Sequence, residues 1–504
     1  SNFIMKATKV SRIAAGALSA LLLSGTLFAC SKEPDEASSA VSETSQSAGA
    51  IFTEHLGERD LGGYTLRILA TAPDQAFSSA QYAPDELNSD PVNDAVLERN
   101  NILSDTYKCE IAVEFVEAHT GVEDRVKNDS LSGTVNYDIV STGLSSLAVL
   151  AANGNLRDFY SIGDSNLQLD QPWWDQQAVE QLSITDKLYF VCGDILYTDD
   201  ERTHMLFFNK DLIAENQLDD PYQLVKDGTW TLDRMYEMAR AVAVDNGDGE
   251  MNVTTGDTWG FIGAAFDTYK FILGCDAPMV EKNEDDVPVI SVLNTKNVDA
   301  FMKTYEMMTD RSACAYLEMF YRWDDSTGRE TFYDQFYSGN ALFMADNICA
   351  LNSAKMQDSS VNYGVLPLPK YDESQDGYAC TIDPYWFTCM ALPAMAADTD
   401  LDKVTFLMEA MAYYNRSEVT PLYYDTTLKS KRLMDESSEE MLDIIFSNRI
   451  MDLANIFSWD DCIQYYNSMI FSGSNAIASY MESHQPAMQK GIDDTIEAFR
   501  KLGA

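Results

Sequence analysis

Positive charge is scarce in this chain. Its 504 residues include 35 Lys and Arg against 80 Asp and Glu, which gives a formal net charge of −45. A surface this acidic repels polyphosphate, so we exclude a nucleic-acid partner, and it disfavours binding to an anionic membrane surface. The acidity either keeps an exported protein soluble or attracts a cationic ligand. We favour the first interpretation, and the sequence leaves the second open.

Motifs for catalysis and cofactor binding are also missing. The chain has no phosphate-binding loop, no Gly-x-Ser-x-Gly motif, no dinucleotide fingerprint and no zinc-ligand spacing, and its 4 histidines lie far apart. Residues 245–250 read Asp-Asn-Gly-Asp-Gly-Glu and look like a calcium loop. Aligning Gly249 with the invariant glycine of such loops places Val244 where the first carboxylate belongs. We therefore favour a surface turn there and expect neither metal nor cofactor, although the sequence does not settle the calcium question.

Cysteine is spread thinly, with 9 residues in the whole chain. One is Cys30, near the N-terminus, and the others stand in apolar contexts such as 189–192, Tyr-Phe-Val-Cys. A chain this large does not need a disulfide framework even when it is exported. We expect most of these cysteines to be buried thiols, and the sequence does not decide which of them pair. They are Cys109, Cys192, Cys275, Cys314, Cys349, Cys380, Cys389 and Cys462.

The one long apolar run lies near the N-terminus, from Ile13 to Phe28, after three basic residues and before Ala29-Cys30. The run is long enough for the apolar part of a signal peptide but short for a membrane-spanning helix. This pattern predicts a bacterial lipoprotein signal over residues 1–29, with Met5 as the initiator and residues 1–4 foreign or mis-assigned. Cys30 would then be lipidated and would anchor an extracytoplasmic protein to the cell membrane. An uncleaved anchoring helix is the alternative.

A polar segment follows Cys30. Residues 31–50 are almost wholly Ser, Ala, Glu, Asp, Thr and Gln, without aromatic residues or a periodic apolar face. Such a segment cannot bury enough apolar surface to offset the entropy of ordering it. We therefore interpret residues 30–60 as a disordered tether. The folded part begins near Leu61, and its length favours two domains.

Strand patterns alternate with helix patterns in the first half of the folded part, which predicts an α/β protein with a parallel or mixed sheet. The expected strands are 64–70, 109–116 and 137–142, and the expected helices are 90–103, 124–131 and 144–153. Ligands of such sheets bind beyond the carboxyl ends of the strands, which places 70–71 and 141–143 on one rim. Further along, we expect helices at 233–244, 298–309, 332–337, 401–414 and 493–502 and a strand at 361–369.

Three segments carry a resemblance to a known family. Residues 206–213, Leu-Phe-Phe-Asn-Lys-Asp-Leu-Ile, resemble the strand-to-helix element of bacterial extracellular solute-binding proteins, family 1. Residues 227–235, Asp-Gly-Thr-Trp-Thr-Leu-Asp-Arg-Met, are similar to that family's helix entry. Residues 336–344 are similar to its helix-to-strand turn, with Asn340 and Leu342 in place of the commoner lysine and alanine, and Tyr-Gly-Val-Leu-Pro-Leu-Pro follows at 363–369.

This resemblance implies a maltose-binding-like, type II periplasmic-binding-protein fold with two α/β lobes and a ligand cleft between them. Lobe 1 would comprise 61–195 plus about 375–428, and lobe 2 about 200–370 plus about 430–504. The chain would cross between lobes near 192–207, 366–378 and 425–433. Family members deliver carbohydrates, and less often other solutes, to an ABC permease. We therefore expect a monomeric solute-binding lipoprotein that is not an enzyme.

A sugar site needs exposed aromatic rings for stacking and planar polar side chains for hydrogen bonds. The resemblance places Trp386, in the segment that starts at Asp383, and Trp459 at the cleft, whereas a tryptophan buried in the core is the alternative for each. Strand ends and the first crossing supply weaker polar candidates, for which capping or a turn is the alternative. These candidates are Thr142, Gly143, Asp194, Tyr197, Asp346, Asn347 and Asp383.

Other functions remain possible from the sequence. A secreted carbohydrate-active hydrolase would also carry many carboxylates and aromatic residues. A binding protein for a polyamine or a peptide would suit the acidic composition. A surface adhesin without transport is a further alternative. The order of the three family segments favours solute binding over hydrolysis, because ordered motifs arise by chance less readily than pairs of carboxylates.

Overall fold

The structure, a computed structural model, describes residues 49–72, 82–429 and 435–501. All of them belong to one compact unit, Ala48–Ala504. The predicted signal peptide, Cys30 and most of the predicted tether lie outside the described residues. The described end of that tether is not disordered, because residues 49–56 are helical and Phe52 is buried against Tyr107 and Tyr414. Within the described ranges, no helix combines the length and the apolar character needed to cross a membrane.

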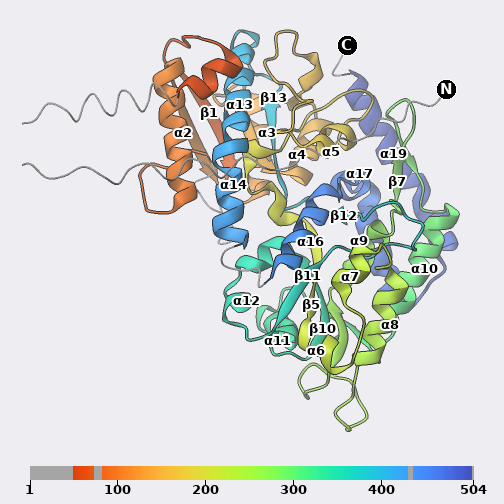
Figure 1. Ribbon diagram of the computed structural model, residues 1–504. Coiled ribbons are helices and arrows are strands. Elements are labelled where there is room, and N and C mark those ends of the chain that lie inside the picture. Colours follow the sequence, from red (N-terminus) through yellow and green to blue (C-terminus); the bar gives the residue numbers. More distant parts are fainter. Residues whose placement is uncertain (1–48, 73–81, 430–434, 502–504) are drawn as a thin grey trace, which may run out of the picture. The chain divides into compact units, whose positions relative to one another are not determined.

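The first sheet is built from strands that lie far apart in the sequence (Figure 1). Strand β1 (Tyr64–Thr71) pairs in parallel with β2 (Cys109–Val116) and with β3 (Ile139–Gly143). Strand β13 (Thr388–Pro393) runs antiparallel to β3 and to β4 (Leu156–Arg157), which gives the order β2-β1-β3-β13-β4. The sheet is therefore mixed, and the strands predicted at 64–70, 109–116 and 137–142 are confirmed to within two residues.

Helices cover this sheet. Helix α2 (Pro91–Tyr107) begins where the Asp90 carboxylate accepts two backbone amides, and it packs beside α13 (Asp398–Glu418). Helices α3 (His119–Ser132) and α4 (Leu144–Ala152) pack together against β1, β3 and β13. The sequence-based prediction for α3 began five residues too late, at 124. The early start was missed because His119-Thr-Gly is a poor helix-forming triplet and no side chain caps this end.

The second sheet has the order β11-β5-β10-β6-β9. Its strands are β5 (His204–Asn209), β6 (Trp259–Gly263), β9 (Cys314–Tyr316), β10 (Ala341–Asn347) and β11 (Tyr363–Leu366). Strand β6 is parallel to both β9 and β10, and β5 is antiparallel to β10 and β11. The carboxyl ends of β6, β9 and β10 therefore meet at one edge.

The family-like segment at 206–213 forms the end of β5 and the start of α6, where the Asn209 side chain accepts the amides of Asp211 and Leu212. The helices around and after the second sheet are α6 (Lys210–Glu215), α7 (Pro221–Lys226), α8 (Leu232–Val242), α9 (Asp267–Gly274), α10 (Thr295–Thr309), α11 (Ser326–Tyr337), α12 (Ala354–Asp358), α16 (Glu436–Ser447), α17 (Leu453–Phe457), α18 (Tyr465–Ser472) and α19 (Ile477–Lys501).

Short elements fill the connections between these parts. The stretch at 245–250 is a turn: the Asp245 carboxylate accepts the amides of Gly247 and Gly249, and Asp257 accepts those of Asn246 and Asn252. The remaining elements are α5 (Gln176–Gln181), α14 (Thr420–Tyr423), the hairpin of β7 (Val280–Lys282) and β8 (Pro288–Ile290), the parallel pair of β12 (Cys380–Thr381) and β14 (Arg449–Ile450), and the short helices η3 (Asp194–Leu196) and η4 (Asp199–Arg202).

Candidate functional site

The carboxyl ends of β1 and β3 carry two threonines joined by a histidine. The hydroxyl oxygens of Thr71 and Thr142 lie 2.7 Å apart, and His119 Nδ1 lies 3.0 Å from the first and 3.1 Å from the second. The same ring nitrogen accepts the backbone amide of Gly143 at 2.9 Å. A nitrogen that accepts an N–H carries no proton, so this network assigns His119 as neutral with its hydrogen on Nε2.

The loop 383–387 lies directly on this network. The first amides of α4 donate to two of its carbonyls, Leu144 to Phe387 at 2.8 Å and Ser145 to Pro384 at 2.9 Å. The Tyr385 and Trp386 rings each stand edge-on to His119 with ring centres 5.3 Å away, and they stand at 85° to each other. Tyr385 is 42% exposed and Trp386 is half-buried. We call Thr71, His119, Thr142, Gly143, Tyr385 and Trp386 the first rim.

The second sheet presents acidic residues at the corresponding edge. Asp267, Glu318 and Asp346 follow or end the parallel strands β6, β9 and β10. The Asp267 carboxylate accepts the Ala264 amide at 2.7 Å and pairs with Lys270 Nζ at 2.8 Å. Glu318 accepts the Ala265 amide at 3.0 Å. We call Asp267, Lys270, Glu318, Tyr333 and Asp346 the second rim.

Burial dominates the electrostatics of the second rim. It raises the pKa of Asp346 to about 6, against the lowering effects of the Asn347 amide, Lys270 and Arg202. Burial also raises the pKa of Glu318. The pKa of the buried Tyr333 hydroxyl is raised well above its ordinary value, first by burial and then by the neighbouring carboxylates. The second rim is therefore an acidic group that two cations partly neutralise.

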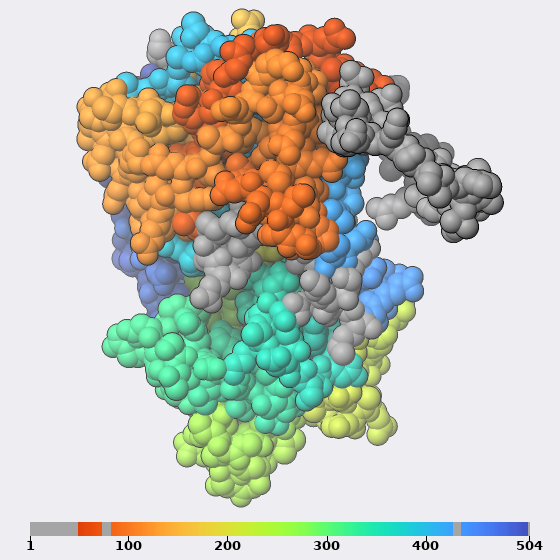
Figure 2. Space-filling view, turned by 90° about the vertical axis from the view of Figure 1, so that its left-hand side faces the viewer, coloured from red at the N-terminus to blue at the C-terminus, as the bar shows by residue number. Residues whose placement is uncertain are grey.

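Arg202 connects the two rims. Its guanidinium carbon lies 5.2 Å from the centre of the Trp386 ring, and its Nη1 donates to Cys349 Sγ at 3.3 Å. Its positive charge also lowers the pKa of Asp346 on the second rim. The backbone fixes the arrangement, because the Arg202 carbonyl accepts the Asp383 amide at 2.9 Å. In Figure 2 the orange segments of the first sheet and the teal segments of the second lie on the same face of this unit, one above the other.

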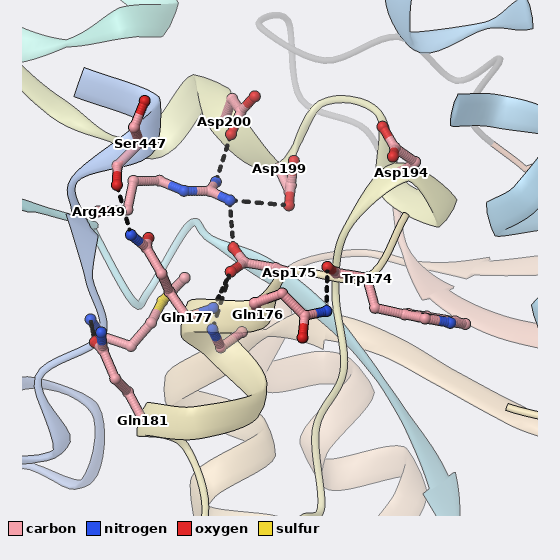
Figure 3. Close-up of polar contacts among 12 residues, drawn as sticks. Trp174, Asp175, Gln176, Gln177, Gln181, Asp194, Asp199, Asp200, Ser447 and Arg449 are labelled. Carbon is pink, nitrogen blue, oxygen red and sulfur yellow. Dashed lines mark hydrogen bonds and ion pairs between the residues drawn. The ribbon is translucent and has the colours of Figure 1, made fainter. Parts of the chain in front are cut away.

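A buried arginine sits where the chain passes between the two sheets (Figure 3). Arg449 Nη1 lies 2.6 Å from Asp200, its Nη2 lies 3.6 Å from Asp199, and it pairs closely with Asp175. Burial raises the pKa of Asp199 even so. The carboxylates of Asp175 and Asp199 and the Cys192 thiol lie within 4.8 Å of one another, as metal ligands do. We assign no metal there, because the guanidinium already supplies the positive charge between the carboxylates.

The structure brings six of the nine predicted ligand residues to these rims. Thr142, Gly143 and Trp386 belong to the first rim, and the Asp383 amide ties the loop to Arg202. Asp346 belongs to the second rim and accepts the amide of the neighbouring Asn347 at 2.7 Å; the Asn347 side chain is buried.

The other three predicted residues have packing contacts elsewhere. Asp194 is buried, lies 3.4 Å from Arg416, and stands apart from Arg449 in Figure 3. The Tyr197 ring packs against Tyr423 with ring centres 5.3 Å apart. Trp459 is 6% exposed, stacks on Phe457 at 5.1 Å, and donates its indole hydrogen to Thr495 at 2.9 Å. These partners lie outside both rims, so we do not carry the three residues into the proposed site.

Several rim residues were not singled out from the sequence. A usable signal existed for two of them, since Asp267 and Glu318 each come shortly after a short buried apolar run, as Asp346 does. No signal marked His119 or Arg202, because their partners come from remote parts of the chain. Thr71 had been placed on the rim by the end of its strand, and the residues missed were His119, Arg202, Asp267, Lys270, Glu318, Tyr333 and Tyr385.

Comparison by sequence finds no matching family model and no matching curated protein. The fold is nevertheless similar to solved structures. An ABC substrate-binding protein from Listeria monocytogenes in complex with cycloalternan aligns with a TM-score of 0.51 at 13% identity, over 88% of this chain and 98% of that one. A cyclo/maltodextrin-binding protein complexed with maltotetraose gives 0.53 at 12%, over 87% and 96%. A sugar transporter from Rhizobium etli in an open conformation gives 0.54 at 13%, over 87% and 99%.

These likenesses define the class of fold. The chain has the two-lobed α/β fold of periplasmic-binding proteins, with mixed sheets flanked by helices, and the fold class expected from the sequence is confirmed. Identities of 12–13% establish the fold alone.

Proposed function

We propose that this protein captures an oligosaccharide between the two rims and delivers it to the transmembrane subunits of an ABC import permease. The observation that carries the proposal is the aromatic pair of the first rim. Tyr385 and Trp386 leave part of their rings accessible beside the hydroxyl and imidazole groups of Thr71, Thr142 and His119. Flat apolar faces next to neutral hydrogen-bonding groups suit a sugar ring. The cargoes named for two of the similar structures, cycloalternan and maltotetraose, support this ligand class.

The charges of the second rim support a neutral ligand over a polyamine. Lys270 pairs with Asp267, and Arg202 lies close enough to Asp346 to lower the pKa of its carboxyl. A polycation would have to compete with both of these resident cations. Asp346 would instead accept a hydrogen bond from a sugar hydroxyl when ionised and donate one when protonated.

Binding without hydrolysis is part of the proposal. A glycosidase uses two carboxyl groups that are free to act on the substrate from either side of the scissile bond. Here, Asp267 and Glu318 each accept a backbone amide that follows β6, so they hold the strand end in place. Incubation with oligosaccharides should therefore leave them intact by chromatography.

The location and organisation of the chain are proposed on the basis of its sequence. The N-terminal pattern supports lipidation at Cys30 and anchoring outside the cytoplasm. A monomer with lobe boundaries near 61–195 plus 375–428 and 200–370 plus 430–504 is the organisation that we propose. Replacement of Cys30 by alanine should release the protein to the medium, and unchanged membrane attachment would contradict the anchor.

A thermal-shift screen tests the ligand class. A ligand that binds only the folded state stabilises it by RT ln(1 + [L]/Kd), about 2.7 kcal/mol at 100 times the Kd. We expect linear or cyclic oligosaccharides to raise the Tm, and polyamines, peptides and amino acids to leave it unchanged. A rise with polyamines or peptides alone would overturn the proposed ligand class. Failure of every class would count against solute capture.

A further inference from the structure

We propose that Cys192 and Cys389 form a cross-strand disulfide when the protein folds under oxidising conditions, and that this bond links the segment that leaves the first sheet to strand β13. The register of the backbone carries this inference. Val191 and Met390 exchange both of their backbone hydrogen bonds, at 2.9 Å and 2.8 Å, in an antiparallel bridge. The next pair along this bridge is Cys192 opposite Cys389.

The position next to such a bridge has the right spacing for a disulfide. In antiparallel pairing, a pair that exchanges hydrogen bonds is followed by one that does not, with Cα atoms about 4.5 Å apart and side chains on the same face. Disulfides span Cα separations of about 4.4–6.8 Å. The neighbouring hydrogen bonds agree, because the Cys192 carbonyl accepts the Asp175 amide on the opposite side, and Cys389 is in register with Thr142 of β3. The backbone groups of Cys192 and Cys389 therefore do not bond to each other, as expected for a pair that does not exchange hydrogen bonds.

The side chains support the pairing. Both cysteines are buried, and hydrogen bonding with the Cys389 thiol is the first cause that raises the pKa of Cys192. Two other buried thiols have backbone partners instead, Cys109 on the Leu103 carbonyl at 3.4 Å and Cys462 on the Ala454 carbonyl at 3.3 Å. The described structure holds all of these cysteines as free thiols.

The proposed disulfide would lie where the chain leaves the first sheet, so it would fix the start of the crossing to the second sheet. Cys192 is followed by Gly193, where a side chain would collide with the Trp173 backbone, and then by η3. The Asp175 and Asp199 carboxylates beside Cys192 bind Arg449. A disulfide would fix the first-sheet end of this crossing covalently, while the Arg449 ion pairs fix it electrostatically.

The oxidation needs a disulfide reagent such as oxidised glutathione. One cysteine thiolate attacks a sulfur of that disulfide and releases one reduced thiol. The second cysteine, deprotonated, then attacks the mixed disulfide and releases the other, so that the two cysteines lose two electrons and two protons overall. Burial and the raised pKa of Cys192 keep thiolate scarce in the folded state, so the bond should form mainly during folding.

Peptide mapping tests the proposal on the full chain. The protein would be purified without reductant, unfolded, and refolded in a buffer of oxidised and reduced glutathione. It would then be alkylated under denaturing conditions, digested and analysed by mass spectrometry. We expect one linked pair of peptides, containing Cys192 and Cys389, that separates on reduction. The Cys380→Ser variant, which removes a different buried thiol, should keep this linked pair.

Two outcomes would overturn the inference. One is alkylation of both Cys192 and Cys389 in refolded wild-type protein whose circular dichroism shows it to be folded. The other is linkage of Cys192 to a different cysteine. A second measurement compares Tm with and without dithiothreitol. Reduction should lower the Tm of the wild-type protein by several degrees and leave that of the Cys192→Ala, Cys389→Ala double variant unchanged. If the double variant does not fold, the wild-type map decides.

Discussion

The two rims are built in the same way and carry opposite chemistry. Each lies at the carboxyl ends of parallel strands, β1 and β3 in the first sheet and β6, β9 and β10 in the second. The first rim contains hydroxyls, a neutral imidazole and two partly exposed aromatic rings, whereas the second contains three carboxylates and a partly buried tyrosine. Sheet topology therefore decides where a site forms, and the residues after each strand decide what it recognises.

The backbone of the first rim gives the largest expected effect. Gly143 has no room for a side chain, because a Cβ there would overlap the Tyr385 carbonyl and crowd the His119 ring. The Gly143→Ala variant must therefore displace the 383–387 loop or the start of α4. We expect it to lower the free energy of unfolding by about 3 kcal/mol, as overpacking of a fixed backbone does. Urea denaturation measures this loss.

The matched control is Gly163→Ala. No atom lies within 4 Å of the Cβ that this substitution adds, and the φ of Gly163 is outside the left-handed region. The free energy of unfolding of this variant should therefore stay within about 0.5 kcal/mol of that of the parent. Equal stability of the Gly143 and Gly163 variants would show that the loop is not held against α4 as described.

The α/β class and the strands β1, β2 and β3 of the first sheet could be predicted from the spacing of apolar residues, whereas the two-lobed fold was predicted from the family resemblance. Strand β2 was predicted with its observed bounds, and α4 was one residue too long. Local patterns also placed Thr142 and Asp346 at strand ends, where ligands of such sheets bind. These predictions needed only short-range information.

Long-range contacts explain what could not be predicted. Trp386 and Trp459 look equally suitable in the sequence, since each is an aromatic residue among acidic and apolar neighbours. Only the fold shows that His119 and Arg202 lie beside Trp386. In the same way, only the fold shows that the indole N–H of Trp459 donates to Thr495 of α19. Likewise, nothing near Arg449 in the sequence indicates that Asp175 and Asp199 surround it.

The two tryptophans provide the second test, an effect on ligand binding. We expect Trp386→Ala to weaken the binding of an oligosaccharide found by the screen by about 1–3 kcal/mol, because a stacking face is lost. Trp459→Phe keeps a ring against Phe457 but loses the hydrogen bond to Thr495, so it should affect stability and leave affinity unchanged. Isothermal titration calorimetry measures both. Unchanged affinity in a folded Trp386→Ala variant would remove the first rim from the ligand site.

The second rim gives the smallest expected effect, a dependence of stability on pH. Burial raises the pKa of Asp346 to about 6 in the folded protein, whereas an unfolded Asp has a pKa of about 3.9. Between these values the folded state binds the proton more strongly, so the free energy of unfolding should rise as the pH falls from 7 toward 4. Asp194 and Asp452, whose pKa values burial also raises to about 6, add to this rise. The hydrogen bond from Arg59 lowers the pKa of Asp402. Protonation of Asp402 therefore reduces the free energy of unfolding, but only at a pH below that at which the other three carboxyls titrate.

The Asp346→Asn variant isolates the contribution of the second rim to that rise. An amide cannot titrate, so the gain in stability from pH 7 to pH 5 should be smaller than in the parent, by on the order of 1 kcal/mol. Replacing the exposed Asp376 by asparagine is the matched control and should leave the gain as it is. Urea denaturation at a series of pH values compares the three proteins. If the Asp346→Asn and parent curves run parallel over this range, Asp346 is not the partly buried, proton-binding carboxyl that distinguishes the second rim from the first.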